Sequence, residues 1–188
     1  MKRIDSRKQH SLVVQPAFLI GTYNPDGTPN FCPITWISVT SDNTQYLLVA
    51  SMNGAKRTKE NIARTGLFSA NLVSTDMLAL LDYFGLRSAM DGPKDGIATA
   101  CQEGHVLPVP TLDQSRWVYE CRVVNTVQTG ETTTYIAKME NVQILEELQD
   151  ADGLWGIDLT RLDPVVYSGM YHAIGKCLGS IGDFHPAD

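Results

Sequence analysis

Short apolar runs, separated by residues that form turns, recur along this chain and predict a mainly β fold. The first two runs, residues 12–24 and 28–39, flank the sequence Asn24-Pro25-Asp26-Gly27. Proline presets one backbone dihedral there and glycine supplies a positive φ, so the two runs are expected to form a hairpin. Further runs rich in β-branched and aromatic residues predict strands at 45–51, 67–73, 116–124 and 132–148.

Two prolines fall inside the first predicted strands and change what is expected there. Pro16 predicts a bulge or an edge position. Pro33 has no N–H to donate to a ladder. The segment 32–36 is therefore expected to be irregular, with backbone groups free for another partner.

Two short helices are predicted between the strands. The first has Thr58 as its N-cap and ends at Gly66, because glycine suits the positive φ that often follows a helix. The second is capped by Thr75 and ends at Gly85. Residues 86–115 then form a long excursion of poor periodicity, which in a compact domain is usually functional or mobile.

These elements predict a single domain over residues 1–188. Several strands joined by hairpins, with a few short helices, favour a closed antiparallel barrel. Strands and helices do not alternate along the whole chain, and no GxGxxG sequence is present. A Rossmann domain is therefore disfavoured.

The stretch from Ser51 to Ile62 carries the clearest candidate chemistry. It joins an apolar strand to the first helix through small residues and two adjacent cations, Lys56 and Arg57. The free N–H groups at a helix start attract anions. Arg57 can bind two phosphate oxygens at once, and Lys56 adds a point charge. The stretch therefore predicts a phosphate site, with a solvated basic turn as the alternative.

The composition narrows the possible functions. Of 188 residues, 43% are hydrophobic and 19% are charged, which suits an ordinary globular core. The net charge of −6 argues against general nucleic-acid binding. No apolar run could span a membrane and the N-terminus has no signal-peptide pattern, so a cytoplasmic protein is expected. The cysteines and histidines lack the spacing of a zinc site, so no metal is expected.

A series of motifs along nearly the whole chain resembles the flavin reductase-like, FMN-binding split-barrel family, and specifically its flavoredoxin-like branch. The motifs are Asp26-Gly27-Thr28-Pro29-Asn30, Ile34-Thr35-Trp36-Ile37-Ser38-Val39, Lys56-Arg57-Thr58-Lys59-Glu60-Asn61-Ile62, Phe68-Ser69-Ala70-Asn71-Leu72, Glu120-Cys121-Arg122-Val123 and Asp163-Pro164-Val165-Val166-Tyr167-Ser168-Gly169. Each is weak alone, but their order is fairly specific. Segment 87–115 fits the family least well.

This resemblance implies an antiparallel, Greek-key-like split β-barrel that forms a homodimer and binds a flavin near the subunit interface. FMN is favoured, with FAD possible. The cofactor phosphate would lie at Lys56, Arg57 and Thr58. The isoalloxazine ring would lie along Pro33, Ile34, Thr35 and Trp36.

Three further residues are implied by the resemblance. Ser51 and Met52 would face the phosphate and ribityl side of the flavin. His172 would lie near the flavin edge, although a surface or tail-packing role fits it as well. Trp36, likewise, could fill the core or a dimer interface instead of walling the ring.

Two functions follow from the resemblance, and the sequence does not separate them. In the first, NAD(P)H reduces the bound flavin, which passes electrons to free flavin or another acceptor. In the second, the protein is an FMN electron carrier of the flavoredoxin type, reduced by a protein partner. A third, a split barrel related to pyridoxamine-phosphate oxidases or one that handles haem, is less favoured. No carboxylate pair or Ser–His–Asp set suggests hydrolysis.

Overall fold

The computed structural model describes residues 14–97, 99–148 and 157–179 of the chain. Its strands are β1 (Gln15–Pro16), β2 (Phe18–Tyr23), β3 (Pro29–Ile34), β4 (Ile37–Ser41), β5 (Tyr46–Met52), β6 (Leu67–Leu72), β7 (Cys101–Glu103), β8 (Pro110–Leu112), β9 (Trp117–Thr129), β10 (Thr132–Ile144), β11 (Val165–Tyr167) and β12 (Tyr171–Ala173). Its helices are α1 (Arg57–Thr65), α2 (Leu78–Leu86) and α3 (Leu159–Leu162), with 3₁₀ turns η1 (Thr75–Met77) and η2 (Glu146–Leu148).

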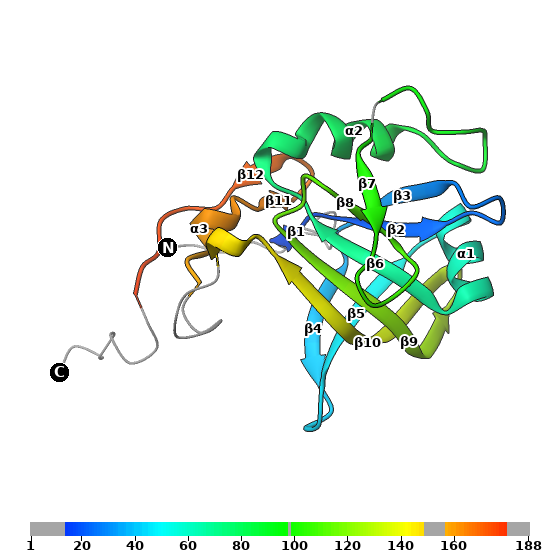
Figure 1. The fold of residues 1–188 in the computed structure, drawn as a ribbon, viewed down its shortest axis with the longest axis horizontal. Helices are drawn as coiled ribbons and strands as arrows, with labels where there is room; N and C mark the ends of the chain where they lie inside the picture. The colour runs from blue at the N-terminus through cyan, green and yellow to red at the C-terminus, as the bar shows by residue number, and fades with distance from the viewer. Residues whose placement is uncertain (1–13, 98, 149–156, 180–188) are drawn as a thin grey trace, which may run out of the picture.

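A curved antiparallel sheet of seven strands forms the body of the molecule (Figure 1). Its strand order is β3-β2-β6-β9-β10-β5-β4, so the two edge strands, β3 and β4, are consecutive in the sequence. Thr35 and Trp36 connect them. In the described residues no ladder joins β3 to β4, so the barrel is split there. This confirms the mainly β split barrel that the family resemblance implied and corrects the closed barrel that the pattern of hairpins favoured.

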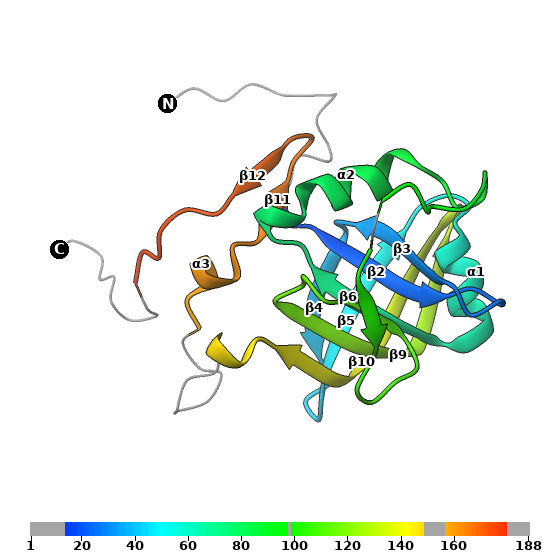
Figure 2. The same cartoon turned by 45° about the horizontal axis from the view of Figure 1, so that its top comes forward.

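Helix α1 lies at one end of the barrel, and α3 lies with the β11–β12 hairpin at the other (Figures 1 and 2). β1, β11 and β12 form a separate three-stranded sheet there. Helix α2 lies over β3, and the excursion that follows it arches toward α1 (Figure 2). The excursion thus covers the edge strand on the side where α1 begins.

The barrel interior is filled by alternate residues of its strands. Ile20, Leu48, Phe68 and Ala70 are at most 1% exposed and pack in one apolar cluster. A second cluster, which includes Leu19, Phe31 and Phe84, lies between the sheet and α2. The two clusters hold β3 from both faces and so fix its position at the sheet edge.

The predicted strand 28–39 was wrong, because the structure divides it into two strands. β3 pairs with β2, whereas β4 pairs with β5 at the other end of the sheet. Pro33 lies within β3, opposite Leu19, and an edge strand tolerates its missing N–H. The irregular stretch is therefore shorter than predicted and comprises only Thr35 and Trp36.

The helix boundaries also differ in part from the prediction. Helix α1 begins at Arg57 and its N-cap residue is Lys56, whereas Thr58 lies inside the helix. Gly66 ends α1 at φ 70°, as predicted. Ser74 precedes η1 as its N-cap residue, and α2 continues through Gly85 to Leu86. The excursion 86–115 is not without structure, because β7 and β8 form a short hairpin inside it.

Candidate functional site

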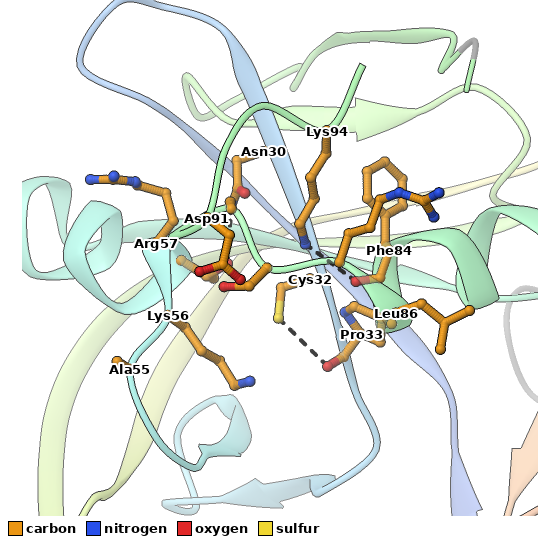
Figure 3. Close-up of a pocket in the computed structure, with 15 residues that line it drawn as sticks. Asn30, Cys32, Pro33, Ala55, Lys56, Arg57, Phe84, Leu86, Asp91 and Lys94 are labelled. Carbon is orange, nitrogen blue, oxygen red and sulfur yellow. Dashed lines mark hydrogen bonds between the residues drawn. The ribbon is translucent and has the colours of Figure 1, made fainter. Parts of the chain in front are cut away.

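A cavity of about 380 Å³ opens beside the start of α1 (Figure 3). Four segments form its walls: β3, the turn that enters α1, the end of α2 and the first part of the excursion. The lining residues are Asn30, Cys32, Pro33, Ala55, Lys56, Arg57, Thr58, Phe84, Gly85, Leu86, Arg87, Ser88, Ala89, Asp91 and Lys94. Four of the predicted site residues, Pro33, Lys56, Arg57 and Thr58, therefore meet at one cavity.

The turn before α1 presents backbone donors at the cavity. Gly54 has φ 70°, and Lys56 is extended at φ −150° and ψ 135° before the helix begins. In the described part of the chain, the N–H groups of Arg57 and Thr58 have no hydrogen-bond partner, as expected for the first turn of a helix. These free N–H groups, at the positive end of the helix dipole, suit a phosphate.

Side chains hold this turn in place from two directions. Lys59 Nζ donates to the carbonyl of Gly54 at 3.0 Å and to that of Glu131 at 2.8 Å, which ties the turn to the β9–β10 hairpin. On the other side, Asn30 Nδ2 donates to Thr58 Oγ1 at 2.9 Å. Thr58 is therefore a buried link between α1 and β3, and not the helix cap that the sequence suggested.

The cavity lining is strongly cationic. It contains Lys56, Arg57, Arg87 and Lys94 against a single carboxylate, Asp91. Arg57 forms an ion pair with Glu60, and its guanidinium points away from the cavity (Figure 3). Arg87 lies over the ring of Tyr83, 4.2 Å from the centroid. Lys56, rather than Arg57, is thus the predicted cation that faces the cavity.

Lys94 was not predicted as a site residue, although it lines the cavity from the excursion. Its Nζ donates to the carbonyls of Phe31 and Phe84, both at 3.2 Å, and lies 5.5 Å from the centroid of the Phe84 ring. Burial lowers the pKa of Lys94, and the nearby charge of Lys56 lowers it further. A half-buried cation beside a cavity is a typical feature of a functional site.

The segment predicted to hold a flavin ring continues from one wall of the cavity. Pro33 lines the cavity, whereas Ile34, Thr35 and Trp36 do not. The carbonyls of Thr35 and Trp36 accept bonds from Ile37 and Ser51. Among the described residues, however, nothing accepts a bond from the N–H groups of Thr35 and Trp36. The expectation of free backbone groups is thus met by the N–H groups and not by the carbonyls.

The remaining predicted site residues do not line the cavity. The hydroxyl of Ser51 lies 2.8 Å from that of Thr134, and the side chain of Met52 is fully buried in the core. His172 is exposed on β12, opposite Val166. β12 contacts the middle of α2, where the hydroxyl of Tyr171 donates to Asp82 at 3.2 Å. A role for His172 at the flavin edge stays a prediction.

Sequence reasoning missed Asn30, Asp91 and Lys94. Asn30 is buried in the structure. In the sequence, its only signal is that it is a polar residue inside a predicted strand. Asp91 and Lys94 lie in Asp91-Gly92-Pro93-Lys94-Asp95, which reads as an ordinary polar loop. Their importance depends on where the excursion crosses β3, and no local pattern predicts that crossing.

A larger cavity of about 1040 Å³ adjoins the first one. The two share Asn30, Arg57, Phe84, Ala89, Asp91 and Lys94 in their linings. In the described ranges, no three His, Cys, Asp or Glu side chains are grouped so that they could hold a metal ion. No described helix is both long and apolar enough to cross a membrane.

Comparison with known proteins agrees with this architecture. The sequence model of the flavin reductase-like domain matches residues 10–175. None of the curated proteins compared is significantly similar.

Several solved structures share the fold. Flavoredoxin of Desulfovibrio vulgaris (Miyazaki F) superposes with a TM-score of 0.85 at 22% identity, over 96% of this chain and 98% of that one. A proposed flavin reductase with a split barrel domain from Shewanella frigidimarina superposes with a TM-score of 0.81 at 22% identity, over 94% of this chain and 93% of that one. An FMN-binding protein from Thermus thermophilus superposes with a TM-score of 0.76 at 19% identity, over 96% of this chain and 99% of that one. Because the family model matches residues 10–175, which is most of the chain, the chain belongs to the flavin reductase-like domain family.

Proposed function

We propose that this protein is an FMN-binding oxidoreductase whose bound flavin is reduced by NAD(P)H. The observation that carries the proposal is the cavity at the start of α1, where the free N–H groups of Arg57 and Thr58 and the side chain of Lys56 lie in one lining with Pro33. Bound FMN would supply the hydride and electron transfer, so the protein needs no nucleophile of its own.

The residues present fit the two ends of such a cofactor. The phosphate would be held by the N–H groups of Arg57 and Thr58 and by the ammonium of Lys56, since among the described residues these donors have no protein partner. The ring would lie along Pro33, Ile34, Thr35 and Trp36, where two backbone N–H groups are free for its polar edge. Ser51 and the backbone of Met52 would lie toward the ribityl chain.

The alternative is an FMN electron carrier reduced by a protein partner instead of NAD(P)H. The similarity to flavoredoxin, at a TM-score of 0.85 over almost the whole of both chains, is what favours it. Both functions need the same flavin site, so they differ only in the electron donor.

Two measurements test the proposal in sequence. The absorption spectrum of the purified protein, followed by identification of the released cofactor, tests for FMN. A protein that binds no flavin under any condition would refute both functions. Rapid mixing with NADH and with NADPH then separates them. Bleaching of the flavin supports the reductase, whereas no bleaching by either nucleotide, with normal reduction by dithionite, supports the carrier.

We also infer a homodimer. The side chains of Trp36, Val39 and Tyr46, at or beside the edge strand β4, are 45%, 53% and 65% exposed. Apolar side chains gathered at an open sheet edge are typical of a surface that another chain covers. Light scattering should give twice the monomer mass, and Tyr46→Arg should shift the equilibrium toward monomer. A wild-type monomer with flavin fully bound would refute the dimer alone.

A further inference from the structure

A third cavity, of about 530 Å³, shares no lining residue with the two cavities beside α1. Its floor is the side of β9 and β10 that faces away from the barrel core, where Val118, Asn141 and Gln143 lie. The β7–β8 hairpin, which crosses in front of β6 (Figure 1), contributes Gln102 and Leu112 to the wall. The proposed flavin site uses none of these residues.

The carboxylate of Glu120 fixes the orientation of two amides in this floor. Asn141 Nδ2 donates to Glu120 Oε1 at 2.6 Å, and Gln143 Nε2 donates to the same oxygen at 2.8 Å. Burial raises the pKa of Glu120, but its hydrogen bonds outweigh burial and lower it, so the group is ionised at neutral pH. An ionised carboxylate only accepts hydrogen bonds, so each amide turns its nitrogen toward Glu120 and its oxygen away.

The two amide oxygens are accessible acceptors. Among the described residues, no group donates to the side-chain oxygen of Asn141 or Gln143. Within the same residues, Trp117 Nε1 is the one fully buried side-chain nitrogen or oxygen without a partner, so these two oxygens are not fully buried. Because both residues line the cavity, they offer two oriented acceptors to a ligand in it.

The charge around this cavity is the opposite of that beside α1. Its lining contains one carboxylate, Asp113, and one histidine, His105, but no lysine or arginine. Asp113 is exposed and forms no ion pair in the part of the chain that the structure describes. Glu120, beneath the floor, is bonded to amides and backbone N–H groups and not to a cation. The cavity therefore favours a positively charged ligand.

We propose that this cavity binds a guanidinium group carried on an alkyl chain. A guanidinium has one positive charge and five N–H donors in a plane, and it is more weakly hydrated than an ammonium. Its donors suit acceptors that come from different walls, here the amide oxygens of Asn141 and Gln143 and the carboxylate of Asp113. The alkyl chain would pack against the apolar side chains of Val118 and Leu112.

The guanidinium can belong to a small molecule or to an arginine in an extended peptide. β5 pairs with β10 from Thr133 to Lys138, so in the described ranges the stretch of β10 at the cavity pairs with β9 alone. A free strand edge can pair with an extended peptide. The test therefore includes one probe of each kind.

The test follows the backbone amide NMR signals of the full-length, ¹⁵N-labelled protein at about pH 8, above the range in which histidine ordinarily ionises. Propylguanidine should shift the signals of residues 102, 113 and 141–145. Its uncharged isostere, propylurea, should bind at least about ten-fold more weakly, because its hydrogen bonds are not charge-assisted.

The peptide probe is a capped pentapeptide with arginine between alanines, and its control has citrulline in place of arginine. The arginine peptide should bind at least about ten-fold more tightly than the citrulline peptide, for the same reason. Tighter binding of the arginine peptide than of propylguanidine would assign the guanidinium to a partner protein that pairs with β10. Equal affinities would assign it to a small molecule.

Two exposed positions test the site without changing the core. Gln102→Lys places a cation in the wall and should weaken both guanidinium probes by at least about ten-fold. Asp113→Asn removes the carboxylate and should weaken them by about three- to ten-fold. Gln128→Lys makes the matched change on β9 outside the lining and should leave both affinities unchanged. The NMR spectrum of each variant also shows whether it is folded.

The inference is overturned if propylguanidine shifts no signal of the cavity at about 10 mM, which is ten times a millimolar dissociation constant. It is also overturned if propylurea binds as tightly as propylguanidine. Equal losses for Gln128→Lys and Gln102→Lys would overturn it as well, since binding would then reflect the general surface charge. These outcomes leave the flavin proposal untouched, because the cavities share no residue.

Discussion

Two regions of this protein contain a buried or partly buried charged side chain, and they differ in how many hydrogen bonds the protein supplies to it. Glu120 on β9 is 0% exposed and accepts five hydrogen bonds. Three come from the backbone N–H groups of residues 105–107, and two come from the amides of Asn141 and Gln143. The ammonium of Lys94, in the cavity beside β3 and the end of α2, donates to two carbonyls at 3.2 Å and forms no ion pair within the described residues.

The comparison separates a charge with a full set of protein partners from a charge that is available to a ligand. Glu120 has every oxygen lone pair engaged, so it fixes the loop between β7 and β8 against the barrel and has nothing left for a ligand. Lys56 and Lys94 have unused donors that face open space. Buried charge with a complete set of partners therefore indicates stability, and half-buried charge without counter-ions indicates a site.

The largest expected effect is a loss of stability on substitution of Glu120. Glu120→Ala would leave five donors without an acceptor and should lower the free energy of unfolding by about 3–5 kcal/mol, as when one partner of a buried charged network is removed. Urea denaturation followed by circular dichroism measures it. A loss below about 1 kcal/mol would mean that water replaces the carboxylate and that the comparison fails.

The next effect lies in the cavity and concerns affinity. Lys56→Met should weaken FMN by about ten- to a hundred-fold, because a charge-assisted hydrogen bond is worth roughly 1.5–3 kcal/mol. Arg57→Ala should cost less, since its guanidinium is held by Glu60. Riboflavin, which lacks the phosphate, serves as the control ligand and should bind both variants as it binds wild type. A larger loss for Arg57→Ala would show that Arg57 leaves Glu60 to bind the phosphate.

A smaller effect should appear in the pH dependence of stability. Burial alone raises the pKa of Glu120, but the hydrogen bonds from Asn141, Gln143 and the 105–107 backbone outweigh it, and the net pKa is lowered. The group therefore stabilises the fold above its unfolded pKa of about 4.3, and this contribution is lost as the pH falls through the folded value. Glu120→Gln should show a weaker decline in unfolding free energy below about pH 4.3 than wild type. An identical decline in both would mean that other carboxyl groups dominate acid unfolding.

The smallest effect concerns Lys59, which supports the turn before α1. Lys59→Met removes the bonds to the carbonyls of Gly54 and Glu131 and should cost about 1 kcal/mol of stability. FMN affinity should fall only two- to three-fold, roughly, because the N–H groups of the helix start remain. A loss as large as that of Lys56→Met would show that Lys59 itself binds the phosphate. Differential scanning fluorimetry and FMN titration provide the two readouts.

The sequence by itself was sufficient for the mainly β class, for the strand before α1 and for the helix end at Gly66. These features depend on near neighbours: alternation of side chains, turn chemistry and the φ of glycine. The turn that enters α1 was predictable for the same reason, because Gly54, Lys56 and the start of α1 are adjacent in the chain. The order of the motifs also indicated the family to which the chain belongs.

Only the tertiary structure decided how distant segments meet. Residues 28–39 look like one strand locally, yet β3 and β4 pair with different neighbours at opposite ends of the sheet. Thr58 has the side chain of a helix cap, but the fold places it against Asn30 instead. Lys94 became a cavity residue only because the excursion packs over β3 and α2. Such contacts depend on the position of the whole sheet, and a local pattern of residue types carries no information about it.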